Sequence, residues 1–128
     1  MTMDPMEIVN AWVEAANAQD TEGLIALSDP QIEIVGPRGS GFGHQLLRDW
    51  LARAGLTLET LRRFAHDSSV VLEQRGVWRS METGEISGDA VVASAFEVNG
   101  QRVVKFARFD SLDDALRAAG LSPSDEIA

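Results

Sequence analysis

Hydrophobic and polar positions follow two different periods along the chain, and the period changes after Gly55. Before that point, apolar residues recur every three or four positions, as they do along one face of an amphipathic helix. This spacing predicts helices over 5–18, over a short segment that begins at Asp20 or Thr21, and over 44–54. Beyond Gly55, segments rich in β-branched, aromatic and leucine residues predict strands.

The predicted strands cover 31–35, 57–66, 70–79, 90–98 and 102–110. Turn-forming residues separate the last four strands, which therefore form two antiparallel hairpins in a meander. A last helix follows over 111–120, and we expect residues 122–128 to be a frayed tail. The order α-α-β-α-β-β-β-β-α predicts an α+β fold in a single domain over 1–128.

The segment 36–43 contains four glycines and a proline, which disfavour both helix and strand. We predict a flexible loop there. Its Gly-x-Gly-x-Gly run precedes a helix, but the spacing matches neither a phosphate-binding loop nor a dinucleotide fingerprint. No cofactor is therefore expected.

The chain of 128 residues has a formal net charge of −9. Such a surface repels phosphate backbones and anionic lipids, so we expect neither nucleic acid nor a membrane as a partner. The chain has no Cys and only two His, which lack metal-ligand spacing, so no metal site is predicted. A signal peptide and a membrane-spanning stretch are both absent, which predicts a cytoplasmic protein.

Several segments together resemble the nuclear transport factor 2-like (NTF2-like) superfamily, and in particular its SnoaL-like, ketosteroid isomerase-like branch. The resemblance covers nearly the whole chain and lies in the segments 8–20, 23–27, 32–37, 100–104 and 109–121, together with Trp50. It implies a cone in which a curved antiparallel sheet wraps around the N-terminal helices and leaves a pocket open at one end. Members include ketosteroid isomerases, dehydratases, epoxide hydrolases and polyketide cyclases, so the resemblance does not specify an activity.

Isomerase-like members of this superfamily use an Asp base, a Tyr and a second carboxylic acid. By the resemblance, these positions fall on Ile34, Trp12 and Ser94 in this sequence. An Ile accepts no proton, and an indole N–H lacks the acidity of a phenol. The sequence therefore argues against ketosteroid isomerase chemistry.

An enzyme remains an alternative, with a polar set drawn from His44, Ser94, Arg108 and Asp110. Epoxide hydrolase-like members place an Arg between two Asp, and Arg108 and Asp110 share one face of the predicted last strand. His44 begins a helix near the expected pocket mouth and is a candidate base. The competing interpretation is structural: Arg108 pairs with Asp110 or Glu33, Asp110 caps the last helix, and His44 faces solvent.

Our first hypothesis is instead that the cone binds a small, mainly apolar organic molecule without a catalytic apparatus. The residues expected to line its pocket are Trp12, Ile34, Trp50, Ser94, Phe96, Phe106 and Arg108. The aromatic residues among them are equally consistent with simple core packing. A third hypothesis is an interaction module whose cavity is vestigial.

A stripe of small apolar residues, Val91, Ala93 and Ala95, has the opposite phase to Phe96 and so faces the outside of the predicted sheet. An exposed apolar stripe on a sheet usually meets a partner, so we predict a homodimer centred there. The alternative is that the C-terminal helix folds back over the stripe within one chain.

Overall fold

Polar caps and apolar stripes form helices where the sequence predicts them. The computed structural model describes residues 3–36 and 39–127. In α1 (Pro5–Asn17), the Asp4 carboxylate accepts a hydrogen bond from the Glu7 backbone N–H at 2.9 Å, and the Glu7 carboxylate accepts one from the Asp4 backbone N–H at 3.2 Å. This reciprocal capping satisfies backbone donors that the first turn leaves free. The other helices also match the prediction: α2 (Thr21–Ala26), α3 (His44–Ala54) and α4 (Leu112–Ala119).

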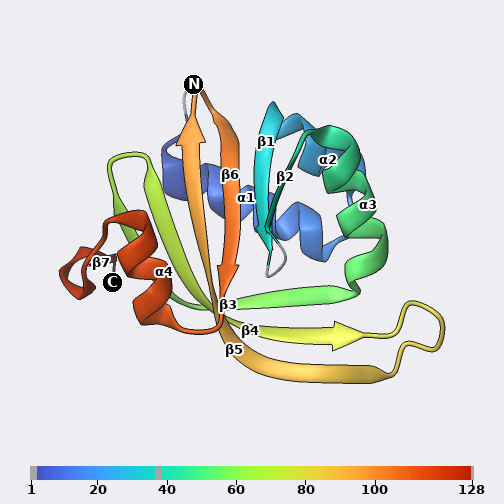
Figure 1. Ribbon diagram of the computed structural model, residues 1–128. Coiled ribbons are helices and arrows are strands. Elements are labelled where there is room, and N and C mark those ends of the chain that lie inside the picture. Colours follow the sequence, from blue (N-terminus) through green and yellow to red (C-terminus); the bar gives the residue numbers. More distant parts are fainter. Residues whose placement is uncertain (1–2, 37–38, 128) are drawn as a thin grey trace.

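The strands form one curved, mixed sheet with the order β2-β1-β6-β5-β4-β3-β7 (Figure 1). Their bounds are β1 (Ser28–Gly36), β2 (Gly39–Phe42), β3 (Leu56–His66), β4 (Ser69–Arg79), β5 (Ile86–Asn99), β6 (Arg102–Phe109) and β7 (Glu126–Ile127). The meander β3 to β6 is antiparallel as predicted. The sheet is mixed rather than purely antiparallel, because β1 joins β6 in parallel.

The glycine-rich segment is largely a strand rather than the predicted loop. Gly39–Phe42 pairs antiparallel with the end of β1, with Gly36 opposite Gly39 and Glu33 opposite Phe42. An edge strand has one neighbour only, so it tolerates glycine better than a central strand does. Pro37 and Arg38, which also belong to the predicted loop, lie outside the described residues.

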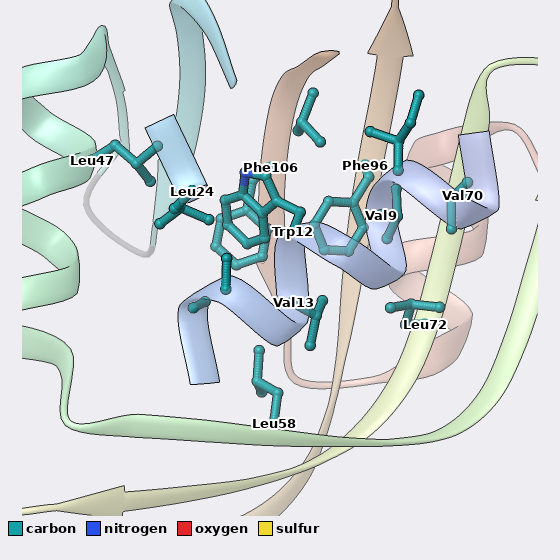
Figure 2. Packing of buried hydrophobic residues seen from close by; sticks show 14 of the residues in the cluster. Val9, Trp12, Val13, Leu24, Leu47, Leu58, Val70, Leu72, Phe96 and Phe106 are labelled. Carbon is teal, nitrogen blue, oxygen red and sulfur yellow. The ribbon is translucent and has the colours of Figure 1, made fainter. Parts of the chain in front are cut away.

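Two apolar layers cover the two faces of the sheet. On the concave face, α1 packs against the sheet, and the buried aromatic side chains of Trp12, Phe96 and Phe106 meet at its centre (Figure 2). The Trp12 ring centroid lies 4.9 Å from that of Phe106 and 5.4 Å from that of Phe96. On the other face, α4 covers a second cluster that includes Phe64 and Val71. No helix within residues 3–36 and 39–127 is long and apolar enough to cross a membrane.

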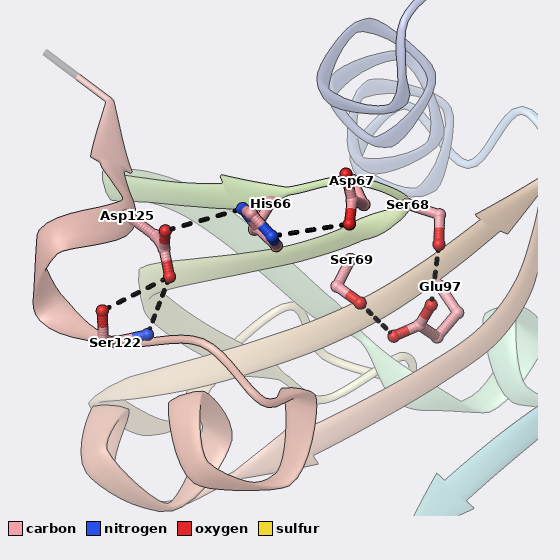
Figure 3. Close-up of polar contacts among 7 residues, drawn as sticks. All are labelled: His66, Asp67, Ser68, Ser69, Glu97, Ser122 and Asp125. Carbon is pink, nitrogen blue, oxygen red and sulfur yellow. Dashed lines mark hydrogen bonds and ion pairs between the residues drawn. The ribbon is translucent and has the colours of Figure 1, made fainter.

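The C-terminal segment, which we expected to be frayed, is attached to the sheet up to Ile127. Its two-residue strand β7 pairs with β3, and Glu126 accepts two hydrogen bonds from Arg62, at 2.8 and 3.0 Å. These hydrogen bonds lower the pKa of Glu126 and raise that of Arg62. Figure 3 shows the preceding turn, where Asp125 lies 3.9 Å from His66. The tail therefore covers an edge of the sheet that would otherwise be open to pairing with another chain.

Candidate functional site

The main candidate site is a hollow between α3 and the β1–β2 hairpin. Its volume is about 440 Å³. Ile34, Leu46 and Trp50 provide its apolar wall, and Arg53 lies at its rim. Gly36, Gly39 and Gly41 form the remaining wall together with Ser40, so few side chains project from that side. A smaller hollow of about 90 Å³ lies on the other face, between α4 and the sheet.

The aromatic residues predicted to line a cavity all face the inside of the cone. Trp12, Phe96 and Phe106 are almost fully buried and contact one another, so they fill the interior rather than border an open space. Trp50 is half-buried. Its ring centroid lies 6.0 Å from that of Trp12, and it also borders the hollow. Among the predicted pocket residues, Trp50 and Ile34 are the two that line the hollow.

Trp12 and His44 are both held by Ser28, a buried residue at the start of β1. The Trp12 indole N–H donates to Ser28 Oγ at 2.9 Å, and that hydroxyl donates to the Leu24 carbonyl at 2.7 Å. His44 Nε2 donates to the Ser28 carbonyl at 3.0 Å. The two hydrogen bonds thus link α1 and α3 to the start of β1. His44 is therefore half-buried and bonded to the β1 backbone. It does not face solvent, contrary to what the competing interpretation expected.

Ser94 is fully buried, and its hydroxyl donates to Gln74 Oε1 at 2.8 Å. Gln74 Nε2 in turn donates to Thr60 Oγ1 at 3.3 Å. Gln74, like Ser94, is almost fully buried, and within the described residues every buried side-chain polar atom has a partner. Ser94, Gln74 and Thr60 therefore form a row of hydrogen-bonded side chains on the concave face. An unpaired polar group buried there would lower the stability of the fold.

Arg108 and Asp110 do not form the predicted pair. The strand β6 ends at Phe109, so Asp110 lies beyond it and is exposed. The final helix is capped by Ser111, whose hydroxyl accepts from the Asp114 N–H at 3.2 Å. Glu33, the other expected partner of Arg108, lies 3.9 Å from Lys105. Arg108 instead stacks on Trp78, with its guanidinium carbon 5.2 Å from the ring centroid.

The candidate catalytic residues also lie at different ends of the sheet. Ser28, which holds His44, is paired with Val103 at the start of β6. Arg108 follows five positions later, which is roughly 17 Å along a strand at about 3.4 Å per residue. No three potential metal ligands come together within the described ranges. The structure therefore does not assemble His44, Ser94, Arg108 and Asp110 into one constellation.

The outer stripe is covered within the chain, as in the alternative interpretation. Ala93 and Ala95 are buried with Ala115 and Leu116 of α4. Two of the three residues proposed for a dimer contact are thus shielded by the same chain, which corrects the predicted centre of that contact. Val91 lies beyond α4 and is 54% exposed.

Sequence reasoning missed Leu46, Arg53 and the glycine wall of the hollow, and it missed the contact of Trp78 with Arg108. The alternation along β4 contained a signal for Trp78, because Val70, Leu72 and Trp78 share one phase. No comparable signal pointed to the glycine wall, since its geometry depends on the pairing of β2 with β1.

No protein-family model matches this sequence, and no curated protein matches it. Solved structures do match. An NTF2-like protein of unknown function from Cytophaga hutchinsonii is 9% identical with a TM-score of 0.74, over 89% of this chain and 96% of that one. A protein with a ketosteroid isomerase-like fold from Catenulispora acidiphila, in complex with trimethylamine, is 18% identical with a TM-score of 0.70, over 94% and 96%.

A third match is a Mycobacterium tuberculosis protein in complex with estradiol-17β-hemisuccinate. It is 16% identical with a TM-score of 0.72, over 87% of this chain and 97% of that one. The helices on the concave side of a curved, unclosed sheet define the class of α+β cones. Within that class, the chain has the NTF2-like fold, as the resemblance in its sequence implied.

Proposed function

We propose that this protein binds a small, mainly apolar organic molecule in the hollow bordered by Ile34, Leu46 and Trp50. The apolar wall of Ile34, Leu46 and Trp50, which borders an open hollow of about 440 Å³, is the observation that carries the proposal. Ligand sites in proteins usually occupy about 300–1,000 Å³ and combine an apolar lining with few polar groups. The apolar side chains of this wall are not covered by other parts of the protein, so an apolar ligand can pack against them.

Backbone geometry on the open side of the hollow also favours a ligand. A Cβ atom placed on Gly36 or Gly39 would meet no atom within 4 Å, whereas one on Gly41 would overlap Leu46, so the free space lies in front of Gly36 and Gly39. Two solved structures of the same fold hold small molecules, trimethylamine in one and estradiol-17β-hemisuccinate in the other. The fold is thus compatible with the proposed role, although the ligands belong to those proteins.

Catalysis receives less support than binding. The position expected for a base is Ile34, and the Trp12 N–H is already bonded to Ser28. An enzyme of the isomerase type also requires hydrogen-bond donors aimed at the developing oxyanion. The Ser94 hydroxyl is not available for this role, because it is buried and already donates to Gln74. Binding without turnover is therefore the function that we propose.

The experiment is a binding survey by protein-observed NMR with aromatic and aliphatic fragments. The chain has three Trp, and each indole N–H gives its own signal. Fragments that occupy the hollow are expected to shift the Trp50 indole signal and to leave the buried Trp12 signal nearly unchanged.

A blocking variant and a matched control make the survey specific. Gly36→Leu fills open space and should abolish the Trp50 shifts. Ala52→Leu adds the same side chain at an exposed position of α3 that does not line the hollow, and it should leave the shifts intact. Fragments that bind equally well to the Gly36→Leu variant, or that never shift Trp50, would favour the interaction module instead.

We also propose that the protein forms a homodimer through the part of the outer sheet face that α4 leaves uncovered. Val91 lies there, and the neighbouring Arg75 and Asp89 form a two-fold hydrogen-bonded ion pair at 2.6 and 3.0 Å. The hydrogen bonds of this pair raise the pKa of Arg75 and lower that of Asp89. An apolar centre beside a neutralised pair gives two acidic chains a face on which repulsion is reduced.

A further inference from the structure

Arg108 occupies the concave face of the sheet, and within the described residues no carboxylate pairs with it. It stands opposite Ser94 in the pairing of β5 with β6, and it is half-buried. Among the arginines of the described residues, Arg48 is the other half-buried one, and it pairs with Glu22 at 2.9 Å. No described carboxylate lies within 4.0 Å of the Arg108 guanidinium.

The backbone of Arg108 lies next to that of Gly36, a residue that lines the proposed ligand site. The parallel pairing of β1 with β6 places Val35 opposite Ala107. Gly36 and Arg108 follow one residue further along the two strands and are therefore neighbours. Gly36 lines the hollow and has open space in front of it. Because Gly36 has no side chain, the Arg108 side chain can reach this space past Gly36.

The concave face also opens toward solvent near Arg108. Along the inward phase of β5, Ser94 and Val92 are buried, whereas Ala90 is exposed. Trp78 lies over the small residue Gly76 at this end and supports one face of the guanidinium. This stacking leaves the N–H edges of the guanidinium as the donors available to a ligand.

We propose that Arg108 binds a carboxylate, and that the ligand of the hollow is therefore a flat, apolar organic acid. A guanidinium edge matches a carboxylate with two parallel hydrogen bonds, and partial burial strengthens this attraction relative to bulk water. The apolar body of the acid would lie against Trp50, Ile34 and Leu46. This inference rests on the proposed function, since it specifies the ligand class of the same site.

The test compares 2-naphthoate with 2-naphthamide, which has the same ring system but no charge. Dissociation constants are measured from the Trp50 and Trp78 indole shifts. We expect the acid to bind about tenfold more tightly than the amide, the effect of a hydrogen-bonded charge. Arg108→Gln should remove this preference, so that the dissociation constants of the acid and the amide become nearly equal. Arg102→Gln, at an exposed position of the same strand, should keep the preference.

A further variant guards against misfolding of Arg108→Gln. Arg108→Lys retains the charge without the planar fork, and it should give an intermediate preference. If acid and amide bind equally to the wild type, the carboxylate proposal is wrong while the proposed function stands. If neither compound shifts the Trp50 signal at millimolar concentration, both proposals are overturned for aromatic ligands.

Discussion

The hydrogen bond between Trp12 and Ser28 gives the sharpest test of whether the Trp12 indole stabilises the core or is available to bind a ligand. In the structure, the indole N–H donates to Ser28 Oγ, and Ser28 donates to the Leu24 carbonyl. A double-mutant cycle of Trp12→Phe and Ser28→Ala separates the first bond from the second. Trp12→Phe retains an aromatic ring in the cluster, so the domain should remain folded.

The expected energies follow from these contacts. In the wild type, Ser28→Ala removes the hydroxyl donation to Leu24, at a cost of about 1 kcal/mol, and leaves the indole N–H buried without an acceptor, at a further cost of about 1–3 kcal/mol. With Phe at position 12, no indole N–H remains, and the same substitution should cost about 1 kcal/mol. The coupling energy is therefore about 1–3 kcal/mol.

Urea unfolding followed by far-ultraviolet circular dichroism measures the four free energies, since it does not depend on Trp12 as a fluorophore. Trp50→Phe is the control, because no hydrogen bond of the Trp50 indole to another described side chain or backbone group is found. Ser28→Ala should cost as much in that variant as in the wild type. Equal costs of Ser28→Ala with Trp and with Phe at position 12 would refute the proposed role of the indole.

Three further predictions concern the backbone, the tail and the outer face. Gly55→Ala should destabilise the protein more than Gly120→Ala in denaturant unfolding, because both residues have positive φ but a Cβ at Gly55 would also overlap a backbone carbonyl of β4. Glu126→Gln should speed amide hydrogen exchange in β7 at pH 7, and the difference from the wild type should disappear as the pH falls through the lowered pKa of Glu126, because protonation removes the charge that pairs with Arg62. Light scattering at tens of micromolar should report a dimer that Val91→Arg converts to a monomer, and a monomeric wild type would contradict the proposed dimer.

Local signals in the sequence determined the helices and most of the strands. The Asp4 cap, the apolar spacing through Trp12 and the turn at Asn99-Gly100 act over a few residues, so each predicts its element without knowledge of the rest of the chain. The alternation along the meander also predicted that Phe96 and Phe106 face inward, since the side chains of a strand alternate between its two faces.

Which apolar surface is filled and which is left open depends on tertiary contacts. Whether Trp12, Phe96 and Phe106 line a cavity or fill the core depends on how closely α1 approaches the sheet, and periodicity carries no information on that distance. The pairing of β2 with β1 creates the glycine wall of the hollow, and α4 covers Ala93. The contact of α1 with the sheet and that of α4 with Ala93 join segments far apart in the sequence.

The candidate site shows the same division. The alternation of side chains along the last predicted strand was enough to place Arg108 at an inward-facing position. It did not determine that Asp110 falls beyond the end of β6, or that Trp78 rather than a carboxylate meets the guanidinium. Those outcomes depend on where each strand ends and on which residues lie opposite one another in the assembled sheet. Both are determined by the whole fold, in which buried polar groups must find partners.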